Sequence, residues 1–215
     1  SKGGEGADGV AAAEEAVRAA ALDGAIVEVL AAILDQPYFD TLRTKQQLGY
    51  IVFSGARAQE GVRSLVFIVQ SASYDSKYLL NAAAGFVDGI EAIIANTPEK
   101  DITGFAQGLI DKKLQKDKRL AQELGRHWEE ILPGTFRWDR MQVEAAALKK
   151  VDKAAVLDFF RRYMAPASPE RRVLAMRVDG SAKGASAQGE REVAIPADLR
   201  KLRGAMDLLP ERGFY

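Results

Sequence analysis

Two side chains in residues 37–55 could assist the cleavage of an amide bond without binding a metal. The guanidinium of Arg43 can donate several hydrogen bonds to a carbonyl or carboxylate, and the phenol of Tyr50 can donate one to a developing oxyanion. The sequence around them changes from a polar helical turn to an alternating strand, so both residues stand at the junction. A purely structural role is also open, in which Arg43 pairs with Asp40 on the same turn and Tyr50 packs in the sheet.

A zinc centre needs more ligands than this chain offers. Catalytic zinc takes three protein ligands and an open position for water, whereas the chain has one histidine and no cysteine. Residues 127–131 match H-x-x-E but carry isoleucine where the second histidine of an inverted zinc motif stands. We therefore predict no metal ligand in this chain, and we expect His127 and Trp128 on a helix near the core, with the imidazole ring partly buried.

Other catalytic and binding chemistries have no support in the sequence. There is no G-x-S-x-G turn for a serine nucleophile, and no glycine-rich phosphate loop follows a strand. The basic residues of 111–119 are interrupted by aspartates and lack an aromatic platform, so they predict a solvated helix face rather than a nucleic-acid site. The adjacent carboxylates at 14–15 and 129–130 point in different directions on a helix and are interpreted as surface charge.

The composition is that of an ordinary globular protein. The 215 residues are 47% hydrophobic, and 30 cationic side chains balance 30 anionic ones, which gives no reason to expect nucleic acid. No apolar run approaches the roughly 20 residues that span a bilayer, and the first residues lack the apolar core of a secretory signal. We expect no membrane contact and take a soluble, cytoplasmic setting as the default. The absence of cysteine excludes disulfides within this chain.

The first half of the chain predicts a helix, a hairpin and a second helix. Apolar residues at helical spacing indicate a helix over 10–34, with a break near Gly24 and an end before Pro37. Runs of β-branched and aromatic residues predict antiparallel strands over 48–56 and 62–71. A buried helical stripe follows over 75–95.

The second half predicts helices and one further strand. Thr97 and Pro98 are typical of a cap and first position for a helix that extends to about Leu124. Asp152 is the expected cap of another helix, with Val151 and Val156 as a hydrophobic staple. The remaining expected elements are a helix over 138–149, a helix over 153–164, a strand over 172–178, a polar loop over 180–192 and a terminal docking helix over 198–209. This order indicates an α+β fold, a mainly antiparallel sheet with several helices packed on one face.

An ordered set of segments resembles the insulysin/pitrilysin type of zinc metallopeptidase, the inverzincins. The strongest block is Leu-Arg-Thr-Lys-Gln-Gln-Leu-Gly-Tyr at 42–50, within the similar segment 37–55. Further similar segments follow in the same order, at 65–71, 118–120, 127–131 and 136–140. The resemblance covers about residues 26–178 and is far more specific as an ordered set than any one motif.

The resemblance implies that this chain is similar to the last, C-terminal domain of such an enzyme. In the family, two bowl-shaped halves enclose a chamber, zinc lies in the first domain, and the last domain faces it. The zinc cofactor and the general base would therefore belong to a zinc-bearing N-terminal half or subunit, and this chain alone would not cleave peptides. Arg43 and Tyr50 match the family's arginine and tyrosine that contact the peptide substrate beside the scissile bond, with Tyr50 supporting the oxyanion.

Two other hypotheses stay open. The chain could be a catalytically inactive peptide-binding or interaction module that pairs with a separate zinc-bearing subunit, or a fragment without an independent role. We expect an Ala/Gly-rich extension over 1–22, the peptidase-family domain over 23–180, and a flexible loop with a docking tail over 181–215. The extension does not resemble the strand that opens the family's domain. An exposed sheet edge would then be covered by the extension, a partner or self-association.

Overall fold

The computed structural model describes residues 4–59 and 62–180, with side chains described from Glu14 onward. The polar loop predicted over 180–192 lies outside the described residues except for Gly180. The helix predicted over 198–209 lies wholly outside them.

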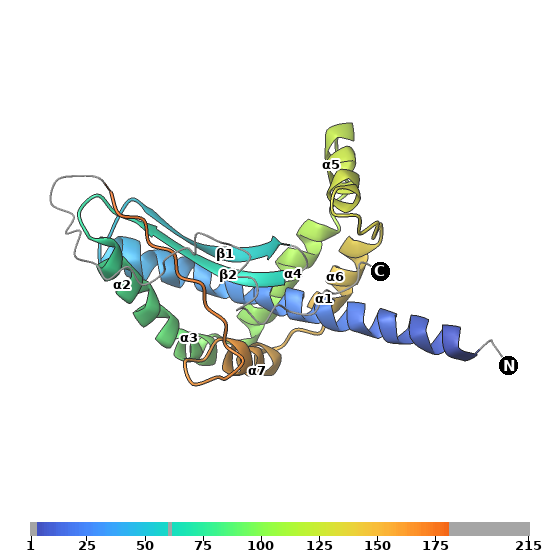
Figure 1. Cartoon of the computed structure of the whole chain (residues 1–215), viewed down its shortest axis with the longest axis horizontal. Coiled ribbons are helices and arrows are strands. Elements are labelled where there is room, and N and C mark those ends of the chain that lie inside the picture. Colours follow the sequence, from blue (N-terminus) through green and yellow to red (C-terminus); the bar gives the residue numbers. More distant parts are fainter. Residues whose placement is uncertain (1–3, 60–61, 181–215) are drawn as a thin grey trace, which may run out of the picture.

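One long helix runs along the molecule and carries the other elements (Figure 1). This helix, α1 (Gly4–Phe39), is continuous through Gly24 and contains Pro37, so the predicted break and the predicted end are both wrong. A Cβ at position 24 would lie 3.3 Å from Nε of Arg63. Glycine at this position therefore leaves room for the side chain of an arginine that packs across the helix.

The helical path continues past Pro37 into the wider turn η1 (Asp40–Lys45), a π-helix. Proline removes one backbone donor and costs a helix interior about 3 kcal/mol. Leu34, Tyr38 and Leu42 on this stretch are fully buried, and each buried side chain of this size contributes about 1.5–3 kcal/mol. Packing therefore outweighs the local preference to end the helix before Pro37.

Two antiparallel strands form the only ladder among the described residues, and both were predicted. β1 (Ile51–Gln59) pairs with β2 (Val62–Gln70) in a register that runs from Ile51 opposite Gln70 to Gln59 opposite Val62. Val52 and Ser54 are buried on the side that α1 covers, whereas Phe53 is exposed. The alternation confirms a half-buried hairpin.

The strand predicted over 172–178 is wrong. Residues 171–180 have no regular secondary structure, and Val173, Leu174, Met176 and Val178 are all exposed. Their side chains suit a strand, but a strand needs a neighbour to satisfy its backbone, and no ladder with β1 or β2 forms here.

Six further helices complete the described fold, and two predicted helices are each found in two pieces. The helix predicted over 75–95 is α2 (Ser76–Asp88) followed by α3 (Ile90–Asn96), which meet at Gly89. The helix predicted to reach Leu124 is α4 (Glu99–Lys113) followed by α5 (Leu120–Ile131). The last two, α6 (Arg140–Leu148) and α7 (Lys153–Tyr163), lie where helices were predicted.

One predicted cap is confirmed and one is displaced. The carboxylate of Asp152 accepts a hydrogen bond of 2.8 Å from the backbone N–H of Ala155 at the start of α7. Before α4, by contrast, Pro98 occupies the cap position instead of the first helical position. Thr97 donates its hydroxyl to the carbonyl of Ile93, and so closes the end of α3 rather than opening α4.

The core gathers around α1, and the predicted α+β class is confirmed. Its largest fully buried side chains come from α1, η1, α3, α4 and α7, together with Leu48 and Leu148. Tyr38 packs its ring against Phe67 of β2 and Phe86 of α2, at centroid distances of 5.1 and 5.0 Å. Burial raises the pKa of the Tyr38 phenol to about 12.

Among the described residues, one stretch, Ser76–Asn96, is long and apolar enough to cross a membrane by length and composition alone, with a mean hydropathy of 1.4 over an 18-residue window. This finding departs from the expectation that no apolar run approaches that length. Leu79, Phe86, Ile90 and Ile94 of the stretch lie in the core, and 22% of the 18-residue window is buried. A single helix of this kind is weak evidence for a membrane span, because a core helix can meet the same test.

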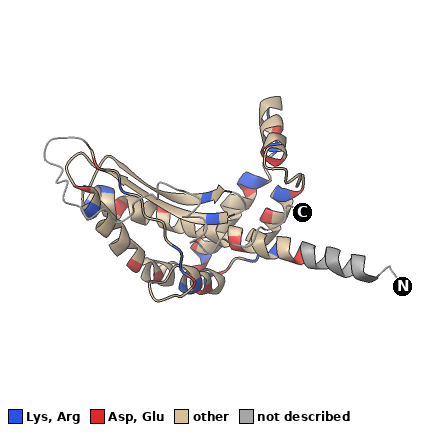
Figure 2. Cartoon of the chain, in the orientation of Figure 1, with Lys and Arg blue, Asp and Glu red and all other residues tan. Residues whose placement is uncertain are grey.

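A largely buried ion network joins α1, β2, α4 and α6. Arg63 contacts Glu28 at 3.3 Å and Glu144 at 2.6 Å, and Lys113 contacts Glu28 at 3.0 Å and Glu144 at 2.8 Å. Elsewhere the acidic and basic residues are interspersed along the elements (Figure 2). Lys113 belongs to the basic segment predicted to be solvated, but its side chain is only 16% exposed, so that prediction is wrong for Lys113.

The partners in this network hold each other in the charged form. Burial alone would raise the pKa of Glu144, but hydrogen bonds and charges from Lys113 and Arg63 lower it overall. Burial alone would lower the pKa of Lys113, but the hydrogen bonds and charges of Glu144 and Glu28 raise it overall. Removing one carboxylate would therefore leave two cations with a single shared partner.

Glu144→Gln should lower the free energy of unfolding by about 2 kcal/mol, because a part-buried ion pair is broken on one side only. Urea denaturation followed by circular dichroism measures the change. Glu14→Gln is the matched control: Glu14 pairs with Arg18 at 3.2 Å, but both side chains are more than half exposed. That change should stay below about 0.5 kcal/mol. Equal losses in the two variants would contradict a structural role for the network.

Candidate functional site

The turn between η1 and β1 is anchored by two buried leucines. Leu42 and Leu48 are both buried, and the N–H of Leu48 donates to the carbonyl of Leu42 at 2.9 Å. The N–H of Gln46 likewise donates to the carbonyl of Thr41 at 3.0 Å. The backbone that carries Arg43 and Tyr50 is therefore held from inside the protein.

Gly49 brings this turn against the end of the neighbouring strand. A Cβ at position 49 would lie 1.9 Å from the carbonyl oxygen of Gln70, closer than any real contact of this kind. Gln47, two residues earlier, has a positive φ of 51°, a conformation that non-glycine residues adopt at a cost. Neither residue was singled out as a site residue from sequence, although glycine between Leu48 and Tyr50 is a signal for a close backbone approach.

Arg43 and Tyr50 come together at this turn. The guanidinium carbon of Arg43 lies 5.2 Å from the centroid of the Tyr50 ring, within cation–π distance. Tyr50 precedes β1 and is 84% exposed, so it does not pack in the sheet. Asp40 accepts a hydrogen bond of 2.8 Å from Gln36, and no ion pair joins it to Arg43 in the described part of the chain. The two contacts predicted for a structural role, Arg43 with Asp40 and Tyr50 within the sheet, are therefore not found in the described part of the chain.

The Arg43–Tyr50 pair suits the recognition of a carbonyl-rich ligand. The N–H groups of the guanidinium can donate to carbonyl or carboxylate oxygens of a ligand. The phenol hydroxyl at the other end of the exposed ring can donate one further hydrogen bond. The pair can thus present several donors without any metal.

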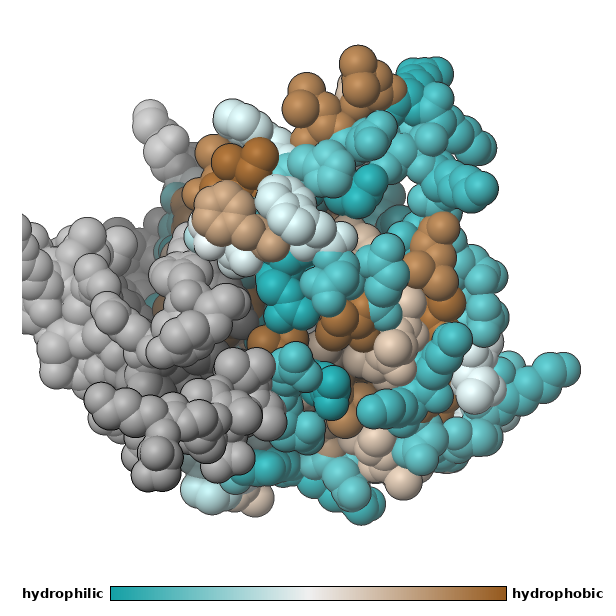
Figure 3. Space-filling view, turned by 90° about the vertical axis from the view of Figure 1, so that its right-hand side faces the viewer, coloured by the Kyte–Doolittle hydropathy of each residue, from teal (hydrophilic) through white to brown (hydrophobic). Residues whose placement is uncertain are grey.

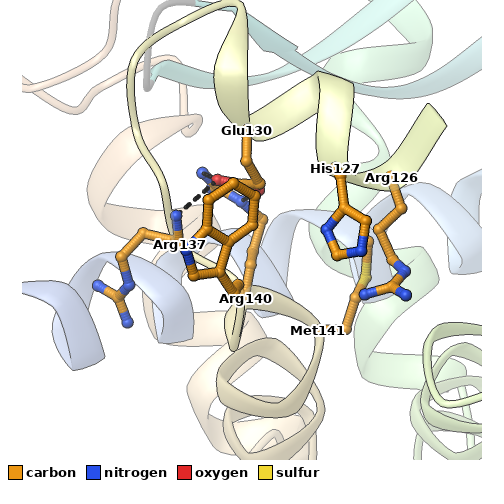
Figure 4. A pocket seen from close by; sticks show the side chains of 7 residues that line it. Arg126, His127, Glu130, Arg137, Arg140 and Met141 are labelled. Carbon is orange, nitrogen blue, oxygen red and sulfur yellow. Dashed lines mark hydrogen bonds and ion pairs between the residues drawn. The ribbon is translucent and has the colours of Figure 1, made fainter. Parts of the chain in front are cut away.

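His127 lies in a small pocket at the base of α5, together with Glu130 (Figure 4). Its ring is half-buried, as predicted, and meets Trp138 edge-on at a centroid distance of 5.5 Å. Trp128, expected near the core, is half exposed. The prediction for Trp128 fails because its side of α5 faces away from the protein.

Glu130, interpreted from sequence as surface charge, is instead buried and fully engaged. It accepts hydrogen bonds from the hydroxyl of Thr135 at 2.6 Å, the backbone N–H of Arg137 at 3.1 Å, and the guanidinium of Arg140. The hydrogen bond from Arg140, the largest of these effects, lowers the pKa of Glu130 to about 2. The carboxylate therefore fastens the loop after α5 to α6.

These residues do not fit a zinc ion. The carboxylate of Glu130 is committed to Arg140 and two further donors, and His127 supplies a single imidazole. Among residues 4–59 and 62–180, no group of three or more histidine, aspartate or glutamate side chains could hold a metal. Glu130 of the H-x-x-E sequence at 127–130 thus has a structural role. We call its contacts with Thr135, Arg137 and Arg140 the Glu130 clasp.

Comparisons with known proteins give a consistent set of relatives. Residues 29–128 match the family described as PQQ synthase PqqF-like, C-terminal lobe domain 4. The insulin-degrading enzyme of Drosophila melanogaster is 32% identical over 184 residues, which is 86% of this chain and 18% of that protein. The human insulin-degrading enzyme is 35% identical over 152 residues, or 71% of this chain and 15% of that protein.

A solved structure gives the same result for the fold. The crystal structure of pitrilysin superposes with a TM-score of 0.60 at 23% sequence identity, over 66% of this chain and 15% of that one. At this identity the likeness supports the fold alone. The chain spans less than a fifth of the length of these relatives.

Gly49→Ala should destabilise the fold by at least about 2 kcal/mol, because the added Cβ would collide with the carbonyl of Gln70 and force the turn to shift. Thermal unfolding measures the loss. Gly108→Ala in α4 is the control, since nothing lies within 4 Å of its Cβ position. Alanine in a helix interior should stabilise by up to about 1 kcal/mol. A neutral Gly49→Ala would show that the turn does not depend on this contact.

The clasp predicts a pH dependence of stability. Because the pKa of Glu130 is lowered in the folded state to about 2, its contribution is fully present above the unfolded value near 4.5 and is lost as pH falls toward 2. Glu130→Gln should therefore cost about 2–3 kcal/mol at pH 6 and progressively less below pH 4.5. Chemical denaturation of both proteins across this range measures the difference. If the difference in the free energy of unfolding between the two proteins does not decrease as the pH falls, the role assigned to the Glu130 carboxylate is refuted.

Proposed function

Because the chain belongs to the insulysin/pitrilysin family of peptidases and corresponds to a C-terminal domain of such an enzyme, we propose that it forms one wall of a peptide-binding chamber. On this proposal Arg43 and Tyr50 position the peptide for hydrolysis. The observation that carries the proposal is the cation–π contact of Arg43 with the exposed ring of Tyr50, on a turn where Gly49 packs against Gln70.

A peptide backbone is the ligand that these donors suit best. Each residue of an extended peptide presents a carbonyl oxygen, and the in-plane N–H groups of Arg43 can donate to such an oxygen. The ring of Tyr50 restricts the guanidinium, so less conformational entropy is lost when the peptide binds. Preorganised donors of this kind convert binding energy into the orientation of the scissile bond.

Tyr50 would add stabilisation of the transition state. During amide hydrolysis the carbonyl oxygen gains negative charge, and a hydroxyl donor placed near it lowers the barrier. The Tyr50 side chain is 84% exposed and can reach a bound peptide. Arg43 would then hold the substrate backbone while Tyr50 donates to the oxyanion.

Zinc and the general base are proposed to lie in another part of the intact enzyme, since the residues of the described chain do not fit the metal. In that setting zinc supplies the activation of water and the polarisation of the carbonyl. The peptide substrate and a zinc-bearing half or subunit are therefore the proposed partners. The chain's own contribution is limited to holding and orienting the peptide.

A chimaera tests these roles: the Drosophila relative in which the aligned residues are replaced by this chain. Tyr50→Phe should lower kcat for a short peptide by about 10–100-fold with little change in KM, because only the transition state loses a donor. Arg43→Ala should lower kcat/KM by about 10-fold or more through weaker substrate binding. Tyr78→Phe, a half-exposed tyrosine on α2, is the control and should leave both constants unchanged.

Full activity in both the Tyr50 and Arg43 variants would contradict the proposed roles of these residues. Peptide binding without any hydrolysis in the chimaera, measured by fluorescence anisotropy, would instead favour the inactive interaction module. The two hypotheses therefore give different results in the same protein.

A further inference from the structure

The β1–β2 hairpin has one face that does not pack on the core of the protein. α1 lies along the inner face of the hairpin, where Val52 and Ser54 are buried (Figure 1). The outer face carries the alternate residues, among them Ile51 and Phe53, which are 46% and 52% exposed. The solvated face of an antiparallel sheet normally carries polar residues. Apolar residues gathered on this face therefore indicate a binding surface.

The apolar residues occupy the end of the outer face that adjoins Tyr50. Across the ladder, Phe53 pairs with Ile68 and Gly55 pairs with Val66. Directly opposed residues share one face of the sheet, so Ile68 and Val66 lie on the outer face beside Phe53. Ile68 is 45% exposed and Val66 is partly exposed. We call these four apolar residues the hairpin patch: Ile51, Phe53, Val66 and Ile68.

Toward the other end of the hairpin the same face is polar. It carries Arg57, Gln59 and Ser64. Val62 is a single apolar residue among them and is 47% exposed. The hairpin patch, by contrast, contains no charged residue. Its apolar character is therefore local to the end of the hairpin that carries the candidate site.

Gly55 determines where the ring of Phe53 lies. A Cβ at position 55 would lie 2.8 Å from Cζ of Phe53, closer than real contacts of this kind. Side chains of a strand usually stand perpendicular to the sheet, but this ring extends along the strand over Gly55. An aromatic ring in this position offers a broad apolar surface to the side chain of a ligand.

A second group of exposed apolar side chains lies on α5, at the top of the view in Figure 3. It includes Leu120, Leu124 and Trp128. α5 projects above α4 and α6 in Figure 1, away from the start of β1. The hairpin patch, in contrast, is continuous with the residues proposed to hold the peptide, because Ile51 directly follows Tyr50.

We propose that the hairpin patch is a subsite for an apolar side chain of the peptide substrate, at the third residue from the bond that is cleaved. The inference rests on the proposed function, in which Arg43 and Tyr50 hold the peptide beside that bond. The size of the hairpin patch favours a peptide side chain over a protein surface. A stable protein interface takes about 20–30 residues from each partner, which is far more than this patch provides.

The position of the subsite follows from strand geometry. A strand rises about 3.3 Å per residue, so Phe53 lies about 10 Å along β1 from Tyr50. An extended peptide that runs along β1 has the same rise. With the cleaved bond at Tyr50, its third residue therefore reaches Phe53 and Ile68. An apolar side chain there loses contact with water, whereas a polar one loses hydrogen bonds to water.

The position is tested in the chimaera by digesting a mixture of random peptides and mapping the cleaved bonds by mass spectrometry. Apolar side chains should be enriched about 10-fold over serine at the third residue on one side of the cleaved bond. Phe53→Thr and Ile68→Thr should each reduce this enrichment to about 3-fold or less and leave the preferences at other positions unchanged. Threonine keeps the preference for a strand, and both replaced side chains are half exposed.

Val62→Thr is the matched control, because Val62 lies on the outer face of the same strand as Ile68 with nearly the same exposure. It should leave the enrichment unchanged. The proposal is overturned if no enrichment is found at the third residue, or if Val62→Thr reduces it as much as Ile68→Thr does.

A binding measurement on the full chain tests the hairpin patch without hydrolysis. The isoleucine methyl groups are isotope-labelled, and the chain is titrated with a short glycine–alanine peptide amide that carries one phenylalanine. The methyl resonances of Ile51 and Ile68 should shift, whereas that of Ile102, which is buried in the core, should not. The same peptide with serine instead of phenylalanine should bind about 10-fold more weakly. Equal binding of the two peptides would contradict the subsite.

Two further results would assign the hairpin patch to another occupant and overturn the proposal. One is a change of the Ile51 and Ile68 resonances on dilution of the free chain, which would identify a second copy. The other is the same change in the free Leu174→Ser variant. Leu174 is 82% exposed, and such a change would show that its own segment covers the patch.

The two experiments separate this subsite from the proposed function. Loss of activity in the Arg43 and Tyr50 variants, without enrichment at the third residue, would reject the subsite and leave the proposed function standing. Full activity in those variants, with selective binding of the phenylalanine peptide at Ile51 and Ile68, would reject the proposed function. The hairpin patch would then still be a surface that binds apolar peptide side chains.

Discussion

The arrangement of this domain depends on the ion network of Glu28, Arg63, Lys113 and Glu144. Each residue comes from a different element, so the network fixes α1, β2, α4 and α6 relative to one another. Ion networks of this kind add little net stability compared with apolar packing, but a broken one is costly. Its main effect here is therefore to specify one arrangement of the elements around α1.

The Arg43–Tyr50 turn and the helix α5 are both connected to this network through regular secondary structure. β2 carries Arg63 near one end and Gln70 at the other, and Gln70 is the residue against which Gly49 packs. α6 carries Glu144 in the network and Arg140 in the clasp on Glu130. The position of the Arg43–Tyr50 turn and the direction of α5 thus share one structural origin.

The sequence correctly predicted those elements whose structure depends on residues close together in the chain. The cap at Asp152, the hairpin and the α+β class follow from residues close together in the chain. The predictions of a helix break at Gly24 and a helix end before Pro37 were wrong because both positions pack against distant residues. Gly24 packs against Arg63, and the residues around Pro37 are buried in the core. Strand-like residues over 172–178 form no strand, because a strand also requires a partner.

In the candidate site, too, the sequence indicated what depends on local residues and missed what depends on contacts with distant ones. The types of Arg43 and Tyr50 indicated their chemistry, but their contact depends on a turn where Gly49 packs against the distant Gln70. Glu130 looked like surface charge because its partner Arg140 lies beyond a loop. The apolar residues of α5 have the periodicity of a core helix, but Leu120, Leu124 and Trp128 are exposed, and periodicity alone does not show whether such residues are buried.

The proposed function places a strict demand on rigidity. The start of β1 lies near the left-hand end of α1 in the view of Figure 1, away from the helices α4 and α6 that join the ion network. If the chain orients a peptide with Arg43 and Tyr50, any bend of α1 moves these donors relative to the scissile bond. A displacement of about 1 Å can cost about 100-fold in rate. An unbroken α1, tied by buried charges to β2, α4 and α6, is the kind of frame that limits such a displacement.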